Sequence, residues 1–144
     1  MLDNLIGRGL QREPSDPEEI RRLRLKAKTK LEDARNTGIS LDSRFDLAYE
    51  SVLQMGLAAL RANGLRPDSR GGHHVMALQT LDKTVRFPKE KLRLIDRFRR
   101  KRAEGLYDGS YEPSEAEVEA LLNTATELKE HLESWLEKEK PDWI

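Results

Sequence analysis

The chain has 144 residues, of which 37% are apolar and 36% are charged, and it contains no cysteine. This composition allows one compact core, so a single domain over residues 1–144 is predicted, and it excludes disulfides, thiol catalysis and cysteine-ligated metal. The longest apolar run, about residues 55–60, is far shorter than the roughly 20 residues that span a bilayer. The N-terminus also lacks a cleavable apolar segment. We therefore expect a cytoplasmic protein that does not associate with a membrane.

Basic and acidic residues number 26 each, so the net charge identifies no partner, but their distribution is uneven. Residues 83–102 contain ten basic and two acidic side chains, whereas residues 108–144 contain eleven acidic side chains and three lysines. One segment is therefore strongly basic and the next strongly acidic. We expect the two to lie side by side and neutralise each other, with a nucleic-acid surface on the basic segment as the alternative.

Residues 1–14 are predicted to form an N-terminal arm. The first helix is expected over 15–36, because Ser15-Asp-Pro-Glu18 combines a capping residue, an early proline and acidic residues. The second helix is expected over 41–63, before Asn63-Gly64, a common left-handed helix stop. Apolar side chains recur at helical spacing along both segments.

The second half of the chain is also predicted to be helical. Residues 65–72, LRPDSRGG, have the composition of a loop. Helices are then expected over 73–86, over 89–107 and, after a capping box that begins at Ser114, over 114–139. No segment shows the alternation of a strand. The predicted fold is an all-α, up-and-down bundle of four to five helices.

Arg102 has an unusual position in the predicted helix 89–107. With successive residues about 100° apart, one face of this helix gathers Leu94, Ile95, Phe98 and Leu106. Arg102 falls in the middle of that face, and Arg99 lies at its rim. Because burial of an unpaired guanidinium costs several kcal/mol, two interpretations stay open. Arg102 faces a ligand or partner and binds phosphate, or it pairs with a carboxylate such as Asp46 or Glu50.

Three further side chains are candidates for the same site. Tyr107 ends the Arg102 helix, either as a site residue or as a structural tyrosine. His73 and His74 follow Arg70-Gly-Gly at a predicted helix start, where they would assist anion binding or cap the helix. Neighbouring helical residues point about 100° apart, so joint binding of one metal by the histidines is not expected. No cofactor or metal motif is present, and neither group is expected.

Four segments together carry a resemblance to a known family. They are Ser43-Arg-Phe-Asp-Leu-Ala-Tyr49, Gly72-His-His74, Arg99-Arg-Lys-Arg102-Ala-Glu-Gly-Leu-Tyr107 and Ser114-Glu-Ala-Glu-Val-Glu119. In order and spacing they resemble the HEPN superfamily, small helical bundles of prokaryotic defence and toxin–antitoxin systems. The resemblance covers nearly the whole chain. It implies a HEPN-like fold, and many members of the family are metal-independent ribonucleases that act as dimers.

The family signature is an arginine followed four to six residues later by a histidine, near the end of the fourth helix. Arg102 matches the arginine, whereas Tyr107 stands where the histidine is expected. A phenol that titrates near pH 10 is a poor base at neutral pH, so the proton-transfer half of the motif is missing. The resemblance therefore implies a nucleotide- or RNA-binding protein that is non-catalytic or an altered ribonuclease. It also implies a homodimer through the fourth helix and a minimal nucleotidyltransferase as partner.

The residues predicted to bind RNA or nucleotide are Arg99, Arg102, Tyr107, His73 and His74. Of these, Arg102 and Tyr107 are the candidates for catalysis. Two alternatives remain for the function: a helical protein-interaction adaptor without a nucleic-acid ligand, or an active metal-independent ribonuclease that uses His73 or His74.

Overall fold

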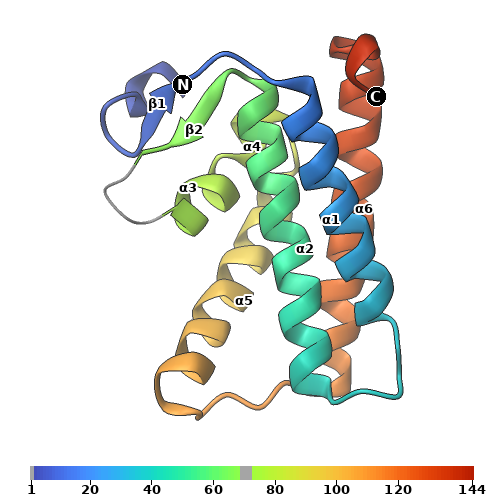
Figure 1. The fold of residues 1–144 in the computed structure, drawn as a ribbon. Coiled ribbons are helices and arrows are strands. Elements are labelled where there is room, and N and C mark those ends of the chain that lie inside the picture. The colour runs from blue at the N-terminus through green and yellow to red at the C-terminus, as the bar shows by residue number, and fades with distance from the viewer. Residues whose placement is uncertain (1, 69–72) are drawn as a thin grey trace.

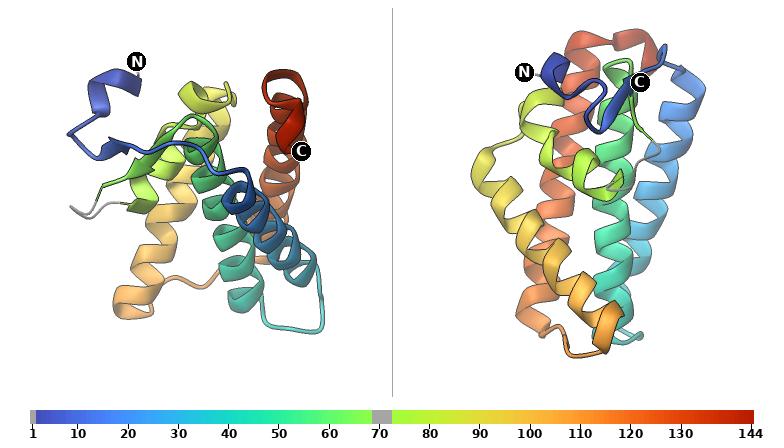
Figure 2. Two further views of the ribbon diagram at one scale, coloured as in Figure 1. Left: turned by 45° about the horizontal axis from the view of Figure 1, so that its top comes forward. Right: turned by 90° about the vertical axis from the view of Figure 1, so that its left-hand side faces the viewer.

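The computed structural model describes residues 2–68 and 73–144, and its predominantly helical structure confirms the all-α prediction. The long helices are α1 (Pro17–Ala34), α2 (Leu41–Ala62), α5 (Lys89–Asp108) and α6 (Glu115–Glu139). α1, α2 and α6 lie side by side, and α5 crosses the bundle obliquely (Figures 1 and 2). α1 and α5 run opposite to α2 and α6, which gives an up-and-down bundle. Two short 3₁₀ helices lie near the chain ends, Leu2–Leu5 and Pro141–Trp143.

Three of the long helices begin at side-chain caps. Asp16 accepts a hydrogen bond from the backbone N–H of Glu18 at 3.0 Å, before α1. Ser40 caps α2 in the same way, and Ser114 and Glu117 form a reciprocal capping box at α6. These bonds satisfy N–H groups that have no partner within their helix. The local sequence therefore fixes where α1, α2 and α6 begin.

The helix predicted over 73–86 is wrong as a single element. The chain instead forms two short helices, α3 (His73–Gln79) and α4 (Leu81–Thr84). The break falls at Thr80, whose hydroxyl donates to the carbonyl of Met76 at 2.6 Å. A side-chain bond of this kind offers the backbone an alternative to regular helix and often bends it.

The N-terminal arm and the predicted loop each contain a short strand that the sequence does not predict. β1 (Leu10–Arg12) pairs antiparallel with β2 (Leu65–Pro67), with Gln11 opposite Arg66. Strands of three residues are too short to display an alternating pattern. The pairing makes the arm part of the fold, because Leu10 becomes fully buried.

α2 is the centre of the core. Fourteen of its residues are buried, whereas α5, which is described throughout, buries only Ile95 and Phe98. α3 packs against α2 at Gly56, where a Cβ atom would lie 2.7 Å from the carbonyl oxygen of Ala77. Figure 1 shows α5 diverging from α2 toward its C-terminal end. The predicted site residues therefore lie on the least buried of the long helices.

Candidate functional site

The Arg102 side chain spans the space between α5 and α2. Its Nε lies 3.5 Å from Oδ1 of Asp46, and its Nη2 lies 4.0 Å from Oε1 of Glu50. The guanidinium carbon lies 4.8 Å from the ring centroid of Tyr49, within the range of a cation–π contact. Carboxylate pairing, one of the two interpretations of Arg102, is therefore present in the fold.

These ionic contacts are long, and the cluster is half open to solvent. Nε of Arg102 is buried and has no hydrogen-bond acceptor among the described residues, while Asp46 and Glu50 are 42% and 37% exposed. Burial raises the pKa of the Asp46 carboxyl; Arg102 opposes the rise, and the charges of Asp42 and Glu50 add to it. Arg102 thus connects α5 to α2, and its ionic partners remain accessible to solvent.

Arg99 is engaged within α5 itself. Its Nη2 lies 2.9 Å from Oδ1 of Asp96, and Nε of Arg100 lies 3.1 Å from the other oxygen of the same carboxylate. Burial alone would raise the pKa of Asp96, but the hydrogen bond and charge of Arg99 and the charge of Arg100 outweigh it and lower the pKa. Arg99 is therefore paired within the chain, although it shares the single carboxylate of Asp96 with Arg100.

Tyr107 lies apart from this cluster, in the last turn of α5. It is 91% exposed, and its neighbour Leu106 is 68% exposed. The sequence places Leu106 on the apolar face, but the divergence of α5 from α2 leaves this turn uncovered (Figure 1). Gly109 then ends the helix with a φ of 72°, a conformation that favours glycine. Arg102 reaches inward, whereas Tyr107 extends into solvent.

His73 and His74 begin α3, but their side chains, and residues 69–72 before them, lie outside the described part of the chain. The backbone of α3 lies beside the first half of α5, and Tyr107 is at the other end of α5 (Figure 1). The fold therefore does not gather the five predicted binding residues into one cluster.

The outward face of α5 carries a row of basic side chains. Arg93, Arg97, Arg100 and Lys101 line a shallow hollow of about 400 Å³ together with Asp96 and Glu104. Arg93 and Arg97 are exposed and form no ion pair with any described residue. The expected neutralisation by α6 is partial. It consists of Lys91–Glu127 at 3.0 Å and Lys101–Glu117 at 2.5 Å.

A second basic surface, which the sequence analysis does not identify, lies on α1. Residues 20–31 contain six basic side chains and no acidic one. Arg21, Arg24 and Lys28 line a hollow between α1 and α6, and Arg22 and Lys26 lie on the neighbouring face. The signal is present as an unbroken basic run. The charge of helix α1 as a whole does not reveal this run, because four acidic residues in the same helix offset its positive charge: Glu18, Glu19, Glu32 and Asp33.

The described residues show neither a metal site nor a membrane-spanning helix. Among the side chains of residues 2–68 and 75–144, no group of three or more His, Asp or Glu is placed to hold a metal ion. Likewise, no helix among the described residues is long and apolar enough to cross a bilayer. Comparison with protein-family models, with curated proteins and with solved structures gives no match.

Proposed function

We propose that this protein binds RNA or nucleotide phosphates without cleaving them, as a HEPN-like member of a prokaryotic defence or toxin–antitoxin module. The observation that carries the proposal is the outward face of α5, where Arg93 and Arg97 extend into solvent with no ion pair among the described residues. Cations that are free of intramolecular partners can replace the counterions of a phosphate backbone, which is the main source of affinity for nucleic acid. Tyr107, exposed on the same helix, offers a ring on which a base can stack.

In this proposal Arg102 positions α5 and does not bind phosphate. Its charge already faces the carboxylates of Asp46 and Glu50, which would repel an incoming phosphate. Cleavage at a ribose hydroxyl benefits from a group that exchanges protons near neutral pH. At the position where the family signature has a histidine, this chain has Tyr107, and a phenol is a poor general base at neutral pH.

The proposal is tested with a fluorescent single-stranded RNA and the double variant Arg93→Gln/Arg97→Gln. We expect the variant to bind at least tenfold more weakly at low salt in fluorescence anisotropy. The slope of log affinity against log salt should fall by about 1.4, or about 0.7 for each lost phosphate contact on a single strand. The matched control is Arg22→Gln/Lys26→Gln on α1, which removes the same charges at the same spacing. Equal weakening by both double variants would overturn the proposal, as would no change in either.

A second candidate function, protein interaction, is favoured by the exposed end of α5. Leu106 and Tyr107 together leave apolar surface uncovered, and the proposed homodimer through α5, or a nucleotidyltransferase partner, would cover it. Light scattering of the wild type and of Leu106→Lys tests this candidate. A dimer that the substitution dissociates supports the homodimer, and a monomer at every concentration contradicts it.

A further inference from the structure

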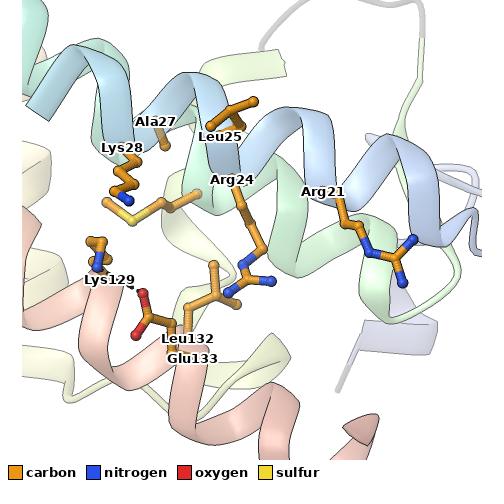
Figure 3. A pocket seen from close by; sticks show the side chains of 9 residues that line it. Arg21, Arg24, Leu25, Ala27, Lys28, Lys129, Leu132 and Glu133 are labelled. Atoms are coloured by element: carbon orange, nitrogen blue, oxygen red, sulfur yellow. Dashed lines mark ion pairs between the residues drawn. The ribbon is translucent and has the colours of Figure 1, made fainter. Parts of the chain in front are cut away.

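A second candidate site lies on the side of the bundle away from α5. It is a hollow of about 270 Å³ between α1 and α6 (Figure 3). Its floor is apolar, because Ala27, Met55 and Leu132 are each 2% exposed. The hollow therefore combines side chains from α1, α2 and α6, so its shape depends on the packing of the bundle and not on one flexible side chain.

The walls of the hollow carry more positive than negative charge. Four cations line it, Arg21, Arg24, Lys28 and Lys129, against one acid, Glu133. Lys129 pairs with Glu133 at 2.8 Å, and Arg21 pairs with Glu18. Arg24 and Lys28 form no ion pair with any described residue. Figure 3 shows both side chains reaching from α1 toward α6. Two positive charges that have no ion-pair partner among the described residues therefore border the apolar floor.

We propose that this hollow binds a small organic phosphomonoester. The phosphate lies between Arg24 and Lys28, where a guanidinium donates paired hydrogen bonds and an ammonium supplies a point charge. The apolar body of the ligand rests on the floor formed by Met55 and Leu132, as is usual in small-molecule sites.

The size and surroundings of the hollow favour a compact anion over a long polyanion. A volume of about 270 Å³ is close to the lower end of the range for small-molecule pockets, roughly 300–1,000 Å³. On the α6 side, Glu133 of the hollow is already paired with Lys129. The exposed Glu130 and Glu137 lie on either side of it along the helix and would repel a phosphate backbone that extends past the hollow. This site is therefore separate from the RNA-binding face proposed on α5.

Isothermal titration calorimetry in phosphate-free buffer tests the site with AMP and with hexyl phosphate. The two probes share the phosphomonoester and differ in the body, so they distinguish a nucleotide from an alkyl ligand. We expect at least one to bind with a Kd below about 1 mM, with inorganic phosphate and adenosine at least tenfold weaker. Lack of binding by both probes would overturn the proposal. Equal binding of inorganic phosphate would also overturn it, because the apolar floor would then contribute nothing.

Two matched double variants locate the binding. Arg24→Gln/Lys28→Gln is expected to weaken binding at least tenfold. Arg22→Gln/Lys26→Gln, with the same charges and spacing on the neighbouring face of α1, should keep the affinity within twofold. All four side chains are at least partly exposed, and thermal unfolding checks that each variant folds. Equal weakening by both pairs, or weakening only by Arg93→Gln/Arg97→Gln on α5, would contradict the assigned site.

Discussion

Arg61 and Arg102 are both largely withdrawn from solvent, but they are satisfied to very different degrees. Arg61 is 2% exposed, its Nε lies 2.6 Å from a carboxylate oxygen of Glu19, and its other nitrogens donate to three backbone carbonyls at 2.6–3.1 Å. Burial alone would raise the pKa of Glu19, but the hydrogen bonds from Arg61 and Arg66 outweigh it and lower the pKa. Arg61 therefore has the contacts of a structural residue, and Arg102 has the looser contacts of a residue at a surface cluster.

This difference predicts unequal losses of stability. Arg61→Met removes one of the two arginines that bind Glu19 and leaves three carbonyl groups without this donor. The free energy of unfolding should therefore fall by roughly 3–5 kcal/mol. Arg102→Met leaves carboxylates that are already half exposed and can be hydrated, so the loss should be about 1 kcal/mol or less. Urea unfolding followed by circular dichroism measures both. Equal losses would show that the Arg102 cluster is as essential to the fold as the Arg61 site.

The partners of Arg102 could be predicted from the sequence, but those of Arg61 could not. Pairing with a carboxylate such as Asp46 or Glu50 is one of the two interpretations of Arg102 that the sequence leaves open, because Arg102 falls on the apolar face of its helix. Arg61 lies in the apolar helix α2. Its hydrogen-bond partners in the N-terminal arm and in α1 precede it by more than 40 residues. No local pattern connects residues at that separation. The exposure of Tyr107 could not be predicted from the sequence either, because it depends on the angle between α5 and α2.

Among the elements, α5 depends on contacts with α6 and with the loop that follows it. Lys101 pairs with Glu117 at 2.5 Å, and Nζ of the same lysine lies 5.4 Å from the ring centroid of Tyr111 in the loop. The hydrogen bond from Lys101 lowers the pKa of Glu117 to about 2, with a backbone hydrogen bond from Ser114 adding to the effect. This ion pair holds the C-terminal half of α5, where apolar burial is small.

The lowered pKa of Glu117 predicts a pH dependence of stability. A carboxylate with a depressed folded pKa stabilises the fold fully above its unfolded value, about 4.3, and this contribution is lost as the pH falls toward 2. The urea midpoint of the wild type should therefore fall between pH 5 and 2 by more than that of Glu117→Gln. Glu115→Gln, at an exposed position of the same helix, is the control. A Glu117→Gln curve parallel to the wild type would contradict the assignment.

Substitution of two helical glycines by alanine is predicted to change the stability of the protein in opposite directions. Gly56→Ala places a Cβ atom 2.7 Å from the carbonyl of Ala77, so α3 must shift and stability should fall by about 1–3 kcal/mol. Gly105→Ala meets Tyr111 at 3.6 Å, an ordinary contact, and should stabilise α5 by up to about 1 kcal/mol through helix propensity. Thermal unfolding compares them, and a stable Gly56→Ala variant would exclude the close approach of α3.

Elements with strong local signals could be predicted, and those set by tertiary contacts could not. Capping residues and regularly spaced apolar side chains were sufficient to predict α1, α2 and α6. The break between α3 and α4 depends on the competing hydrogen bond of Thr80, and β1 pairs with a strand more than 50 residues away. Three residues in such a strand carry no periodic signal of their own.

The whole molecule has a net charge of zero, but its basic and acidic side chains lie on separate surfaces. α1 and α5 are basic and lie on different sides of α2 (Figure 2). α6 is acidic and forms ion pairs with two lysines of α5, Lys91 and Lys101. The sequence predicts the basic character of α5 and the acidic character of α6. It does not predict which arginines remain free of intramolecular partners, because that depends on the register between helices.

The most direct test of RNA binding at the outward face of α5 is an NMR titration of ¹⁵N-labelled protein with a short single-stranded RNA. We expect the amide signals of Arg93, Arg97 and Arg100 to shift progressively, while the RNA remains intact on a denaturing gel. Shifts confined to other helices, or no shifts at all, would contradict the binding face. Cleavage of the RNA that disappears with Tyr107→Phe would contradict binding without catalysis.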